Sequence, residues 1–407
     1  MRDVGADIPS PVRGTPGAKF LRTVERHLAP LKDLPAHGNR TLHLHPLVLT
    51  LVASFYDPAV RSLRAIEQFT IGEGPLTELG LRRMARSTTA DALAAFDPQL
   101  LRGVIDSLQR QMPSLPGHAD ARLPGIVKQI IAADGSYFST FADVVWALHH
   151  TKSDGRRQGQ VRMNLQMSAA DWVPQVVTVS GGEDADGSEP DAVARDLLSG
   201  VLYVVDRNFI DFDFIKALLA KDDDFVLRIR SNTPAYEIVE SRPLTDEDRV
   251  AGVIRDATVR LTGRDAPTGL FRVVEIRHAS KPDEIVRLLT SLSDAEVPAH
   301  VVGEVYRRRW QIELFFRWLK VWCNFDHLLS TSRQGITTQF YVTVIATLLM
   351  NIHLGRKINK FTLIALRQIS TGLATSVGMK GFLDRYDREL ASARRRYAAK
   401  KAAAKKV

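Results

Sequence analysis

The spacing of hydrophobic and polar residues along the chain changes near Pro124. From Ala18 to about Leu115, apolar residues recur at helical spacing, which predicts an all-helical region. After Pro124, short apolar runs rich in β-branched and aromatic residues alternate with helical segments. The order β-β-β-α-β-α-β predicts a mixed sheet with helices on its faces, and therefore an α/β fold. The predicted strands are Ile126–Ala133, Val161–Met167, Val173–Val179, Val201–Val205 and Phe225–Ile229, and the predicted helices are Pro190–Leu198 and Ile210–Ala220.

The C-terminal half of the chain continues with a different pattern. From Arg230 to about Pro298, residues alternate between apolar and polar, which predicts a small antiparallel, β-rich insertion. A long helix is predicted to begin at about Ala299, and Gly335–Leu373 is predicted to be helical. The predicted strands of the insertion are Ala257–Leu261, Phe271–Ile276 and Ile285–Leu289.

The N-terminal region carries the signals of several short helices. Residues 1–17 are rich in Pro and Gly and lack periodicity, which predicts a disordered arm. The hydroxyls of Ser87–Thr89, followed by the acid Asp91, are typical of a capped helix start. A helix, a turn and a capped helix suit a helix-turn-helix reader of DNA, and they suit a plain helical bundle equally well. The predicted helices are Leu47–Phe55, Arg61–Phe69 and Thr77–Ala85.

The composition limits the class of protein. The chain has 407 residues, of which 45% are hydrophobic and 25% charged, as in globular proteins of two or three domains. It has no run of about 18 apolar residues and no apolar signal region at its N-terminus, so we expect neither a membrane span nor export. The single cysteine, Cys323, excludes an internal disulfide and a multi-thiol zinc site, and we expect its side chain to be buried. The cytoplasm is the expected location.

The charge of the chain indicates a polyanionic partner. The net charge is +9 and the isoelectric point is about 9.6, and nucleic acid is the commonest partner of such proteins. The segment Arg394–Lys406 has seven cations and no acid, which fits either a solvated tail or a contact with DNA.

The segment Tyr306–Lys320 (YRRRWQIELFFRWLK) is the most informative part of the chain. In one continuous helix, the polar residues Tyr306, Arg309, Glu313 and Lys320 would fall within an arc of roughly 60°. Most of the remaining circumference is apolar, as in a buried helix, and charges on a buried helix are costly unless they are paired or hold a ligand. We expect Trp310 and Trp318 on this helix to be core residues.

Two further acids follow predicted strands. Asp134 comes after the first strand, and Asp206 comes after the apolar run Val201–Val205. Either one alone is more typical of a turn or a helix cap than of a ligand site. Together with Glu313, they form a carboxylate set of the kind that binds Mg²⁺. Two such ions about 3.5–4 Å apart can drive displacement at phosphorus.

The chain resembles the DDE transposases of bacterial insertion sequences, specifically insertion-sequence family four. That family carries a Tyr, Arg, Glu and Lys signature, whose spacing Tyr306, Arg309, Glu313 and Lys320 match without a gap. Its first acid lies in an Asp-Gly or Asp-Ser pair, as in Asp134-Gly135-Ser136. Its second lies in an Asp-Arg-Gly-Tyr/Phe motif, which Asp206-Arg207-Asn208-Phe209 matches with Asn in place of Gly.

The resemblance implies a ribonuclease-H-like catalytic core with a β-rich insertion, flanked by helical regions. It implies catalysis with two Mg²⁺ ions per site, for which Mn²⁺ substitutes, held by Asp134, Asp206 and Glu313. Its partners would be double-stranded DNA with terminal inverted repeats and a target DNA, both bound by a homodimer. The protein would act in the bacterial nucleoid and would have no membrane partner. The predicted regions are a DNA-binding domain at 18–115, a catalytic domain at 124–350 with its insertion at about 230–298, and a helical C-terminal region with a basic tail at 351–407. The predicted DNA contacts are Tyr306, Arg309, Lys320, Arg207 and Arg317.

Three alternatives remain open at this stage. The first is another ribonuclease-H-like DNA nuclease, and the second is a catalytically silent DNA-binding relic of a mobile element. The third is a glycosidase-like enzyme with paired carboxylates, which the basic charge disfavours. The five tryptophans all lie outside the predicted insertion, so the sequence leaves open whether excised ends pass through hairpins.

Overall fold

The computed structural model describes residues 24–34, 42–57, 59–72, 80–112, 123, 125–140, 144–151, 157–181, 188–231, 233–278, 281–293, 297–323, 325, 327–355, 358–370, 381–389, 391–393 and 395–396. The predicted arm at 1–17 and most of the basic run Arg394–Lys406 lie outside these residues. The chain divides into two compact units. The first comprises Met1–Gln111 and Ile345–Val407, and the second comprises Met112–Val344.

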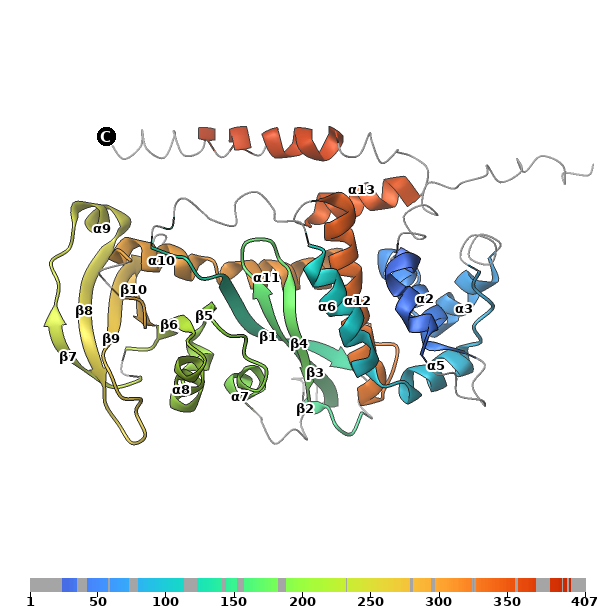
Figure 1. Ribbon diagram of the computed structural model, residues 1–407, viewed down its shortest axis with the longest axis horizontal. Helices are drawn as coiled ribbons and strands as arrows, with labels where there is room; N and C mark the ends of the chain where they lie inside the picture. The colour runs from blue at the N-terminus through green and yellow to red at the C-terminus, as the bar shows by residue number, and fades with distance from the viewer. Residues whose placement is uncertain are drawn as a thin grey trace, which may run out of the picture. The chain divides into compact units, whose positions relative to one another are not determined.

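The second unit is built around one large mixed sheet (Figure 1). Within the described residues, the strand order is β2-β3-β1-β5-β6-β10-β9-β8-β7, and β4 also pairs with β3. The predicted mixed α/β fold is therefore confirmed, although the hydrophobic pattern did not predict β2 or β7. The strands are β1 (Ile130–Thr140), β2 (Leu148–Thr151), β3 (Arg157–Ser168), β4 (Pro174–Ser180), β5 (Leu202–Val205), β6 (Asp224–Ile229), β7 (Tyr236–Ser241), β8 (Val253–Leu261), β9 (Phe271–His278) and β10 (Lys281–Thr290).

The strand directions show how the insertion joins the sheet. β1, β5 and β6 are parallel to one another, and β3 is antiparallel to β1. β10 pairs antiparallel with β6, and β9, β8 and β7 follow as antiparallel neighbours. The insertion is therefore antiparallel, as predicted, but it extends the main sheet instead of forming a separate small one. This pairing satisfies backbone groups of β6 that would otherwise lie at a sheet edge.

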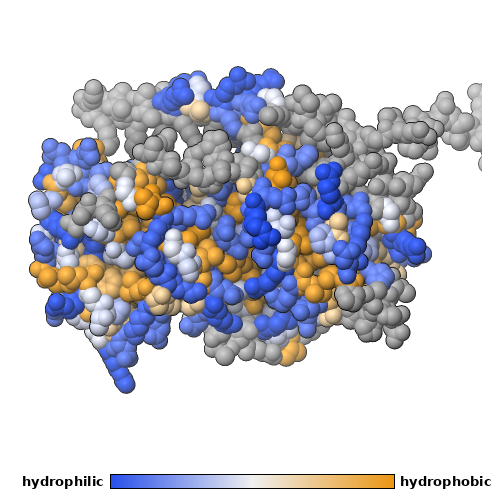
Figure 2. Space-filling model, viewed as in Figure 1, coloured by the Kyte–Doolittle hydropathy of each residue, from blue (hydrophilic) through white to orange (hydrophobic). Residues whose placement is uncertain are grey.

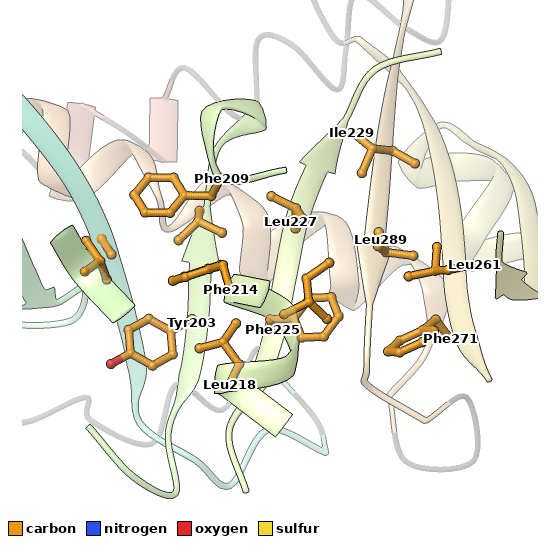
Figure 3. Packing of buried hydrophobic residues seen from close by; sticks show 14 of the residues in the cluster. Tyr203, Phe209, Phe214, Leu218, Phe225, Leu227, Ile229, Leu261, Phe271 and Leu289 are labelled. Carbon is orange, nitrogen blue, oxygen red and sulfur yellow. The ribbon is translucent and has the colours of Figure 1, made fainter. Parts of the chain in front are cut away.

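One face of the central strands is covered by helices α7 (Glu189–Ala194) and α8 (Phe212–Ala220). Aromatic and aliphatic side chains from β5 and β6 pack there against Phe214 and Leu218 of α8 (Figure 3). The cluster continues into the insertion through Leu261, Phe271 and Leu289 (Figure 3). The same hydrophobic core thus holds the central strands and the insertion together.

The opposite face of the sheet carries the signature segment, Tyr306–Lys320. Helix α10 (Ala299–Arg307) contacts β5, β6 and β9, and helix α11 (Trp310–Arg317) contacts β1. Successive side chains of a strand point to opposite faces. Since Ala133 of β1 lies in the core beside α7 and α8, Asp134 points toward the face of α11.

The first unit is helical within the residues that the structure describes. Helices α2 and α3 confirm the predictions near Leu47–Phe55 and Arg61–Phe69, and the hydroxyl of Ser62 caps α3 by accepting from the Ala65 N–H. The helices and 3₁₀ turns are η1 (Ala29–Lys32), α2 (Leu44–Tyr56), α3 (Leu63–Ile71), α5 (Arg86–Ala95), η2 (Pro98–Leu101), α6 (Arg102–Arg110), α13 (Lys360–Ser370) and the C-terminal end of α12 (Arg333–Leu354).

The predicted helix cap at Ser87–Thr89 is wrong. Helix α5 begins at Arg86, so these residues lie inside its first turn, and its N-cap is Ala85, which makes no side-chain cap. The hydroxyl of Thr89 instead donates to the carbonyl of Ala85 at 3.0 Å. Of the predicted helix Thr77–Ala85, residues 80–85 are not helical, and residues 77–79 lie outside the described part. The role of this region in reading DNA stays a prediction.

Helix α12 is long and apolar enough to cross a membrane when only length and composition are considered. Within the protein, however, 94% of its most apolar window is buried. This is the pattern of a core helix, as predicted for its apolar stretch.

The edge strand β7 is open to solvent. Five of its six positions are exposed, and its apolar residues Ile238 and Val239 are flanked by the acids Glu237 and Glu240. Figure 2 shows hydrophobic residues reaching the surface among hydrophilic ones on the visible face. Charges on an edge strand discourage pairing with another chain.

Asp248 connects the insertion to the start of α10. It closes a capping box with Thr245 at the start of α9 (Asp246–Ala251). Its other oxygen accepts hydrogen bonds from the backbone N–H and the ring Nδ1 of His300, each at 2.9 Å. Burial alone would raise the pKa of Asp248, but the hydrogen bonds from Thr245 and His300 lower it to about 2.

We expect Asp248→Asn to destabilise the protein by roughly 1–2 kcal/mol near pH 6, because an amide cannot accept all the hydrogen bonds of the carboxylate. The folded pKa of about 2 lies below the ordinary value of 3.8, so ionised Asp248 stabilises the fold above pH ~4. That contribution is lost as the pH falls toward 2. The difference in Tm between wild type and variant should therefore shrink below pH ~4. A difference that stays constant down to pH 2.5 would contradict this assignment, and Asp246→Asn, at an exposed neighbouring acid, is the control.

Candidate active site

Asp134 lies within strand β1, not at its end. The prediction that the strand stops at this residue is wrong, because β3 pairs with β1 from Ile131 through Thr140. One oxygen of Asp134 accepts from the N–H of Gly135 at 2.8 Å. The carboxyl group is thus fixed on a paired strand, where its position is more rigid than in a loop.

Asp206 directly follows strand β5, as predicted. The parallel register pairs Ala132 with Val204, and the charge of Asp206 acts on the Asp134 carboxyl, so the two acids lie near each other beyond the end of β5. The Asp206 side chain accepts from the N–H of Asn208 at 2.7 Å, at the start of η3 (Arg207–Phe209). It is therefore both a turn cap and a neighbour of the first acid.

Arg228 extends this row onto the third parallel strand. The register of β5 with β6 pairs Val205 with Leu227, so its continuation sets Arg228 beside Asp206. Arg228 also forms an ion pair with Glu284 at 2.8 Å. The sequence analysis did not single out Arg228, because a lone arginine in an apolar strand has no recognisable motif.

The signature segment is not one continuous helix, contrary to the prediction. Helix α10 ends at Arg307 and α11 begins at Trp310, and between them the N–H groups of Arg308 and Arg309 bond to carbonyls three residues earlier. After α11, residues Trp318–Trp322 form a π-helical turn, η4. Such tighter and wider turns within helices are frequent at functional sites.

Arg309 connects the first and third acids. Its Nη1 lies 3.6 Å from Oδ2 of Asp134, and its Nη2 forms an ion pair with Glu313, one turn further along. The Arg309 side chain is only 14% exposed, so these contacts lie in a largely desolvated setting. Asp134 and Glu313, which are far apart in the sequence, therefore share one guanidinium group.

Lys320 and Tyr306 complete the signature. The ammonium group of Lys320 donates to the hydroxyl of Ser136 and to the carbonyl of Tyr137, both at 2.7 Å, so it reaches the strand that carries Asp134. The guanidinium of Arg309 lies 5.9 Å from the centre of the Tyr306 ring. Burial raises the pKa of Tyr306, so its hydroxyl keeps its proton and can donate a hydrogen bond.

The other predicted contacts with DNA lie on the surface. Arg207 in η3 and Arg317 in the last turn of α11 are both exposed. Trp318 is buried, as predicted, but Trp310 is 54% exposed, so its prediction as a core residue is wrong. The break before α11 places Trp310 at the start of a new helix, where the continuous apolar face assumed from the sequence does not apply. Cys323 is buried, as predicted.

A fourth acid, Glu189, lies beside Asp134 and was not predicted. Burial, and then the neighbouring charge of Glu189 and its hydrogen bond, raise the pKa of Asp134 to about 8, with a smaller contribution from Asp206 and an opposing one from Arg309. Burial also raises the pKa of Glu189. In the sequence, Ser188-Glu189-Pro190 has only the features of an ordinary helix start, which gives no sign of this position.

The carboxylates around Asp134 fit a divalent cation. Within the described ranges, no three His, Cys, Asp or Glu side chains already surround a common point. The carboxylates near Asp134 nevertheless offer hard oxygen donors, which Mg²⁺ prefers. Burial is the first cause of the raised pKa values of Asp134 and Glu189, and for Asp134 the charge of Glu189 adds to it, so a cation between the two would relieve that repulsion. The convergence of Asp134, Asp206 and Glu313 on one ion pair stays a prediction.

Comparisons with known proteins show the family to which this chain belongs. The family described as "Transposase DDE domain" matches residues 126–349. The chain is 27% identical over 219 residues to a "Putative transposase y4zB" of Sinorhizobium fredii, covering 53% of this chain and 59% of that protein. It is 26% identical over 206 residues to a "Probable transposase for insertion sequence element IS5377" of Geobacillus stearothermophilus, covering 50% of this chain and 51% of that protein. It is 23% identical over 269 residues to a "Putative transposase for insertion sequence element IS4SA" of Synechocystis, covering 65% and 71%.

The chain therefore belongs to the family of proteins with a DDE transposase domain. The match spans only a little more than half the length of the first two relatives. Among solved structures, a piggyBac transposase synaptic complex with hairpin DNA aligns with 92% of this chain and 82% of its own, at 13% identity and a TM-score of 0.40. That likeness is too weak to add to the description of the site.

Proposed function

We propose that this protein is the transposase of an insertion sequence, of the insertion-sequence family four type. It cleaves DNA at the ends of its element and joins the freed 3′ ends to target DNA. The observation that carries this proposal is Arg309, which contacts both Asp134 and Glu313. Two acids predicted from separate motifs thus share one partner, and the charge of the third acid, Asp206, acts on the Asp134 carboxyl.

The residues of the site suit chemistry on a phosphodiester. Lys320 and Arg309 carry cationic N–H donors next to the carboxylates, and such donors bind phosphate oxygens well. Tyr306 offers a protonated hydroxyl, and the exposed Arg207 and Arg317 can bind phosphates further along the DNA. The mixed sheet with two acids on neighbouring parallel strands supports a ribonuclease-H-like core.

Asp134, Asp206 and Glu313 would hold the divalent ions, for which we propose two Mg²⁺ with Mn²⁺ as a substitute. When bound, these ions would activate the attacking water or 3′-hydroxyl and stabilise the leaving oxygen. In the structure, Arg309 contacts both Asp134 and Glu313, so a cation at these carboxylates competes with the guanidinium. We further propose a homodimer that binds two inverted-repeat ends in the nucleoid.

The proposal is tested with DNA that carries the inverted repeats flanking the gene itself. Incubation with Mg²⁺ and a target plasmid should give nicks at the ends of the element and products in which these ends are joined to the target. Cleavage without joining would instead indicate another DNA nuclease. Binding to the ends without Mg²⁺-dependent nicking would indicate a silent relic of a mobile element. Either result would overturn the proposed function.

A further inference from the structure

Glu189 reaches the proposed catalytic site from the opposite face of the sheet. It is the first residue of α7, which packs against β1 and β3 on the face opposite α11. Its carboxyl group lies within hydrogen-bonding reach of the Asp134 carboxyl. The two acids therefore meet at β1, although they come from opposite sides of it.

The close approach of Glu189 depends on Gly135. A Cβ atom at this position would lie 2.6 Å from Oε1 of Glu189 and 2.9 Å from Cδ of Arg162, which is too close for either contact. A glycine is therefore needed beside Asp134 if Glu189 is to reach the site. The Asp-Gly pair of the first motif thus has a structural consequence beyond a turn.

Glu189 is held in place by the protein around it. The buried guanidinium of Arg162 on β3 donates to the carbonyl of Ser188 at 2.9 Å, and the side chain of Ser188 caps α7 by accepting from the Asp191 N–H. The start of α7 is thereby tied to the strand next to β1. Glu189 is positioned by a packed framework and not by a loose surface loop.

The carboxyl group of Glu189 has the charge of Arg162 and the N–H of Gly135 nearby, but one of its oxygens still lacks a hydrogen bond. Its Oε1 atom is buried and accepts no hydrogen bond. A hydrogen bond to Asp134 requires that one of the two acids carry a proton, because two ionised carboxylates have only acceptors. A buried carboxylate oxygen without a donor is costly, and a cation supplies what it lacks.

We propose that Glu189 is a fourth carboxylate ligand of the metal site, contributed from the face opposite Glu313. This inference rests on the proposed function, since it adds a ligand to the site of that reaction. Glu189 holds a cation next to Asp134 without displacing the Arg309 guanidinium from its contacts with Asp134 and Glu313. The site accordingly has donors on both faces of the sheet.

The experiment measures Mn²⁺ binding to the full chain without DNA, by electron paramagnetic resonance of the free ion. Wild type should bind Mn²⁺, Asp134→Asn should lose this binding, and Glu189→Gln should weaken it by about tenfold or more. Glu237→Gln, at an exposed position on β7, is the matched control and should bind like wild type. Gly135→Ala should also weaken binding, because it displaces Glu189 without removing any ligand.

A second measurement separates a ligand from a merely structural residue. In metal-free buffer, Glu189→Gln should keep or raise the Tm, because it removes one of two crowded acids, while the increase in Tm caused by Mn²⁺ should become smaller. A lower metal-free Tm with unchanged Mn²⁺ affinity would show a structural role and overturn the inference. If wild type binds Mn²⁺ and Glu189→Gln binds it equally well, the inference fails while the proposed function stands. If wild type binds no Mn²⁺, both fail.

Discussion

Asp134→Asn should lower the rate of strand cleavage at the ends of the element by at least about 10³-fold. Metal ions contribute several kcal/mol to such reactions, and each 1.36 kcal/mol corresponds to a factor of ten. Asp134 is the acid on which the other groups converge, since Arg309, Glu189 and the neighbouring Asp206 all influence its carboxyl group. The measurement is the initial rate of nicking on DNA that carries the element's own ends, in Mg²⁺.

Asp213→Asn is the matched control for this loss. Asp213 lies on α8, its side chain is 88% exposed, and its ion pair with Lys216 lies on the surface, so the same chemical change there should leave cleavage unaltered. Undiminished cleavage by Asp134→Asn would end the assignment of this residue. A comparable loss in both variants would show that the assay reports on folding instead of chemistry.

Stability measurements show whether Asp134→Asn keeps its fold. The folded pKa of Asp134, about 8, lies above the ordinary value of 3.8. In metal-free protein, the protonated form is therefore favoured, and stability from this group is lost as the pH rises from about 4 through 8. Asparagine resembles the protonated acid. The variant should therefore be at least as stable as wild type in metal-free buffer at pH 8, and this comparison separates lost catalysis from misfolding.

The sequence predicted those parts of the site that depend on continuous apolar runs. Val201–Val205 and Phe225–Ile229 match β5 and β6 closely, because buried parallel strands need apolar residues on both faces. The end of the run correctly located Asp206. The run before Asp134 also ends there, but β1 continues to Thr140. Its later residues stay in the strand through backbone pairing with β3, which an apolar pattern cannot show.

The remaining differences arise from tertiary contacts. The helical spacing of Tyr306–Lys320 predicted one straight helix, but the hydrogen bonds shift at Arg308 and Arg309, and no Gly or Pro marks the break. Glu189 was missed because the first position of a helix is an ordinary place for an acid. Only the approach of α7 to Gly135 reveals its neighbour in space.

The ion pair of Asp256 and Arg272 should be the largest single electrostatic contribution to stability in the insertion. Both oxygens of Asp256 on β8 accept from Arg272 on β9, each at 2.8 Å, and the two side chains are 6% and 5% exposed. Arg272 also donates to the carbonyl of Val297, two residues before α10, at 2.6 Å. Asp256→Ala leaves a buried guanidinium without its counter-ion. We expect a loss of about 3–5 kcal/mol, measured by urea unfolding.

The comparison with an exposed pair shows whether burial causes this loss. Asp246 and Arg249 are in the same insertion at 2.9 Å, but both side chains are exposed, so Asp246→Ala should change the urea midpoint very little. The double variant Asp256→Leu with Arg272→Met should recover part of the stability, because it removes the buried guanidinium of Arg272, while Arg242 still loses its contact with Asp256 at 3.5 Å. A loss for Asp256→Ala no larger than for Asp246→Ala would contradict the assignment. Arg272 also donates to the carbonyl of Val297, near the start of α10. The variant Asp256→Ala should therefore cleave the ends of the element more slowly, even under conditions where it is still folded. The double variant should restore folding more fully than it restores cleavage.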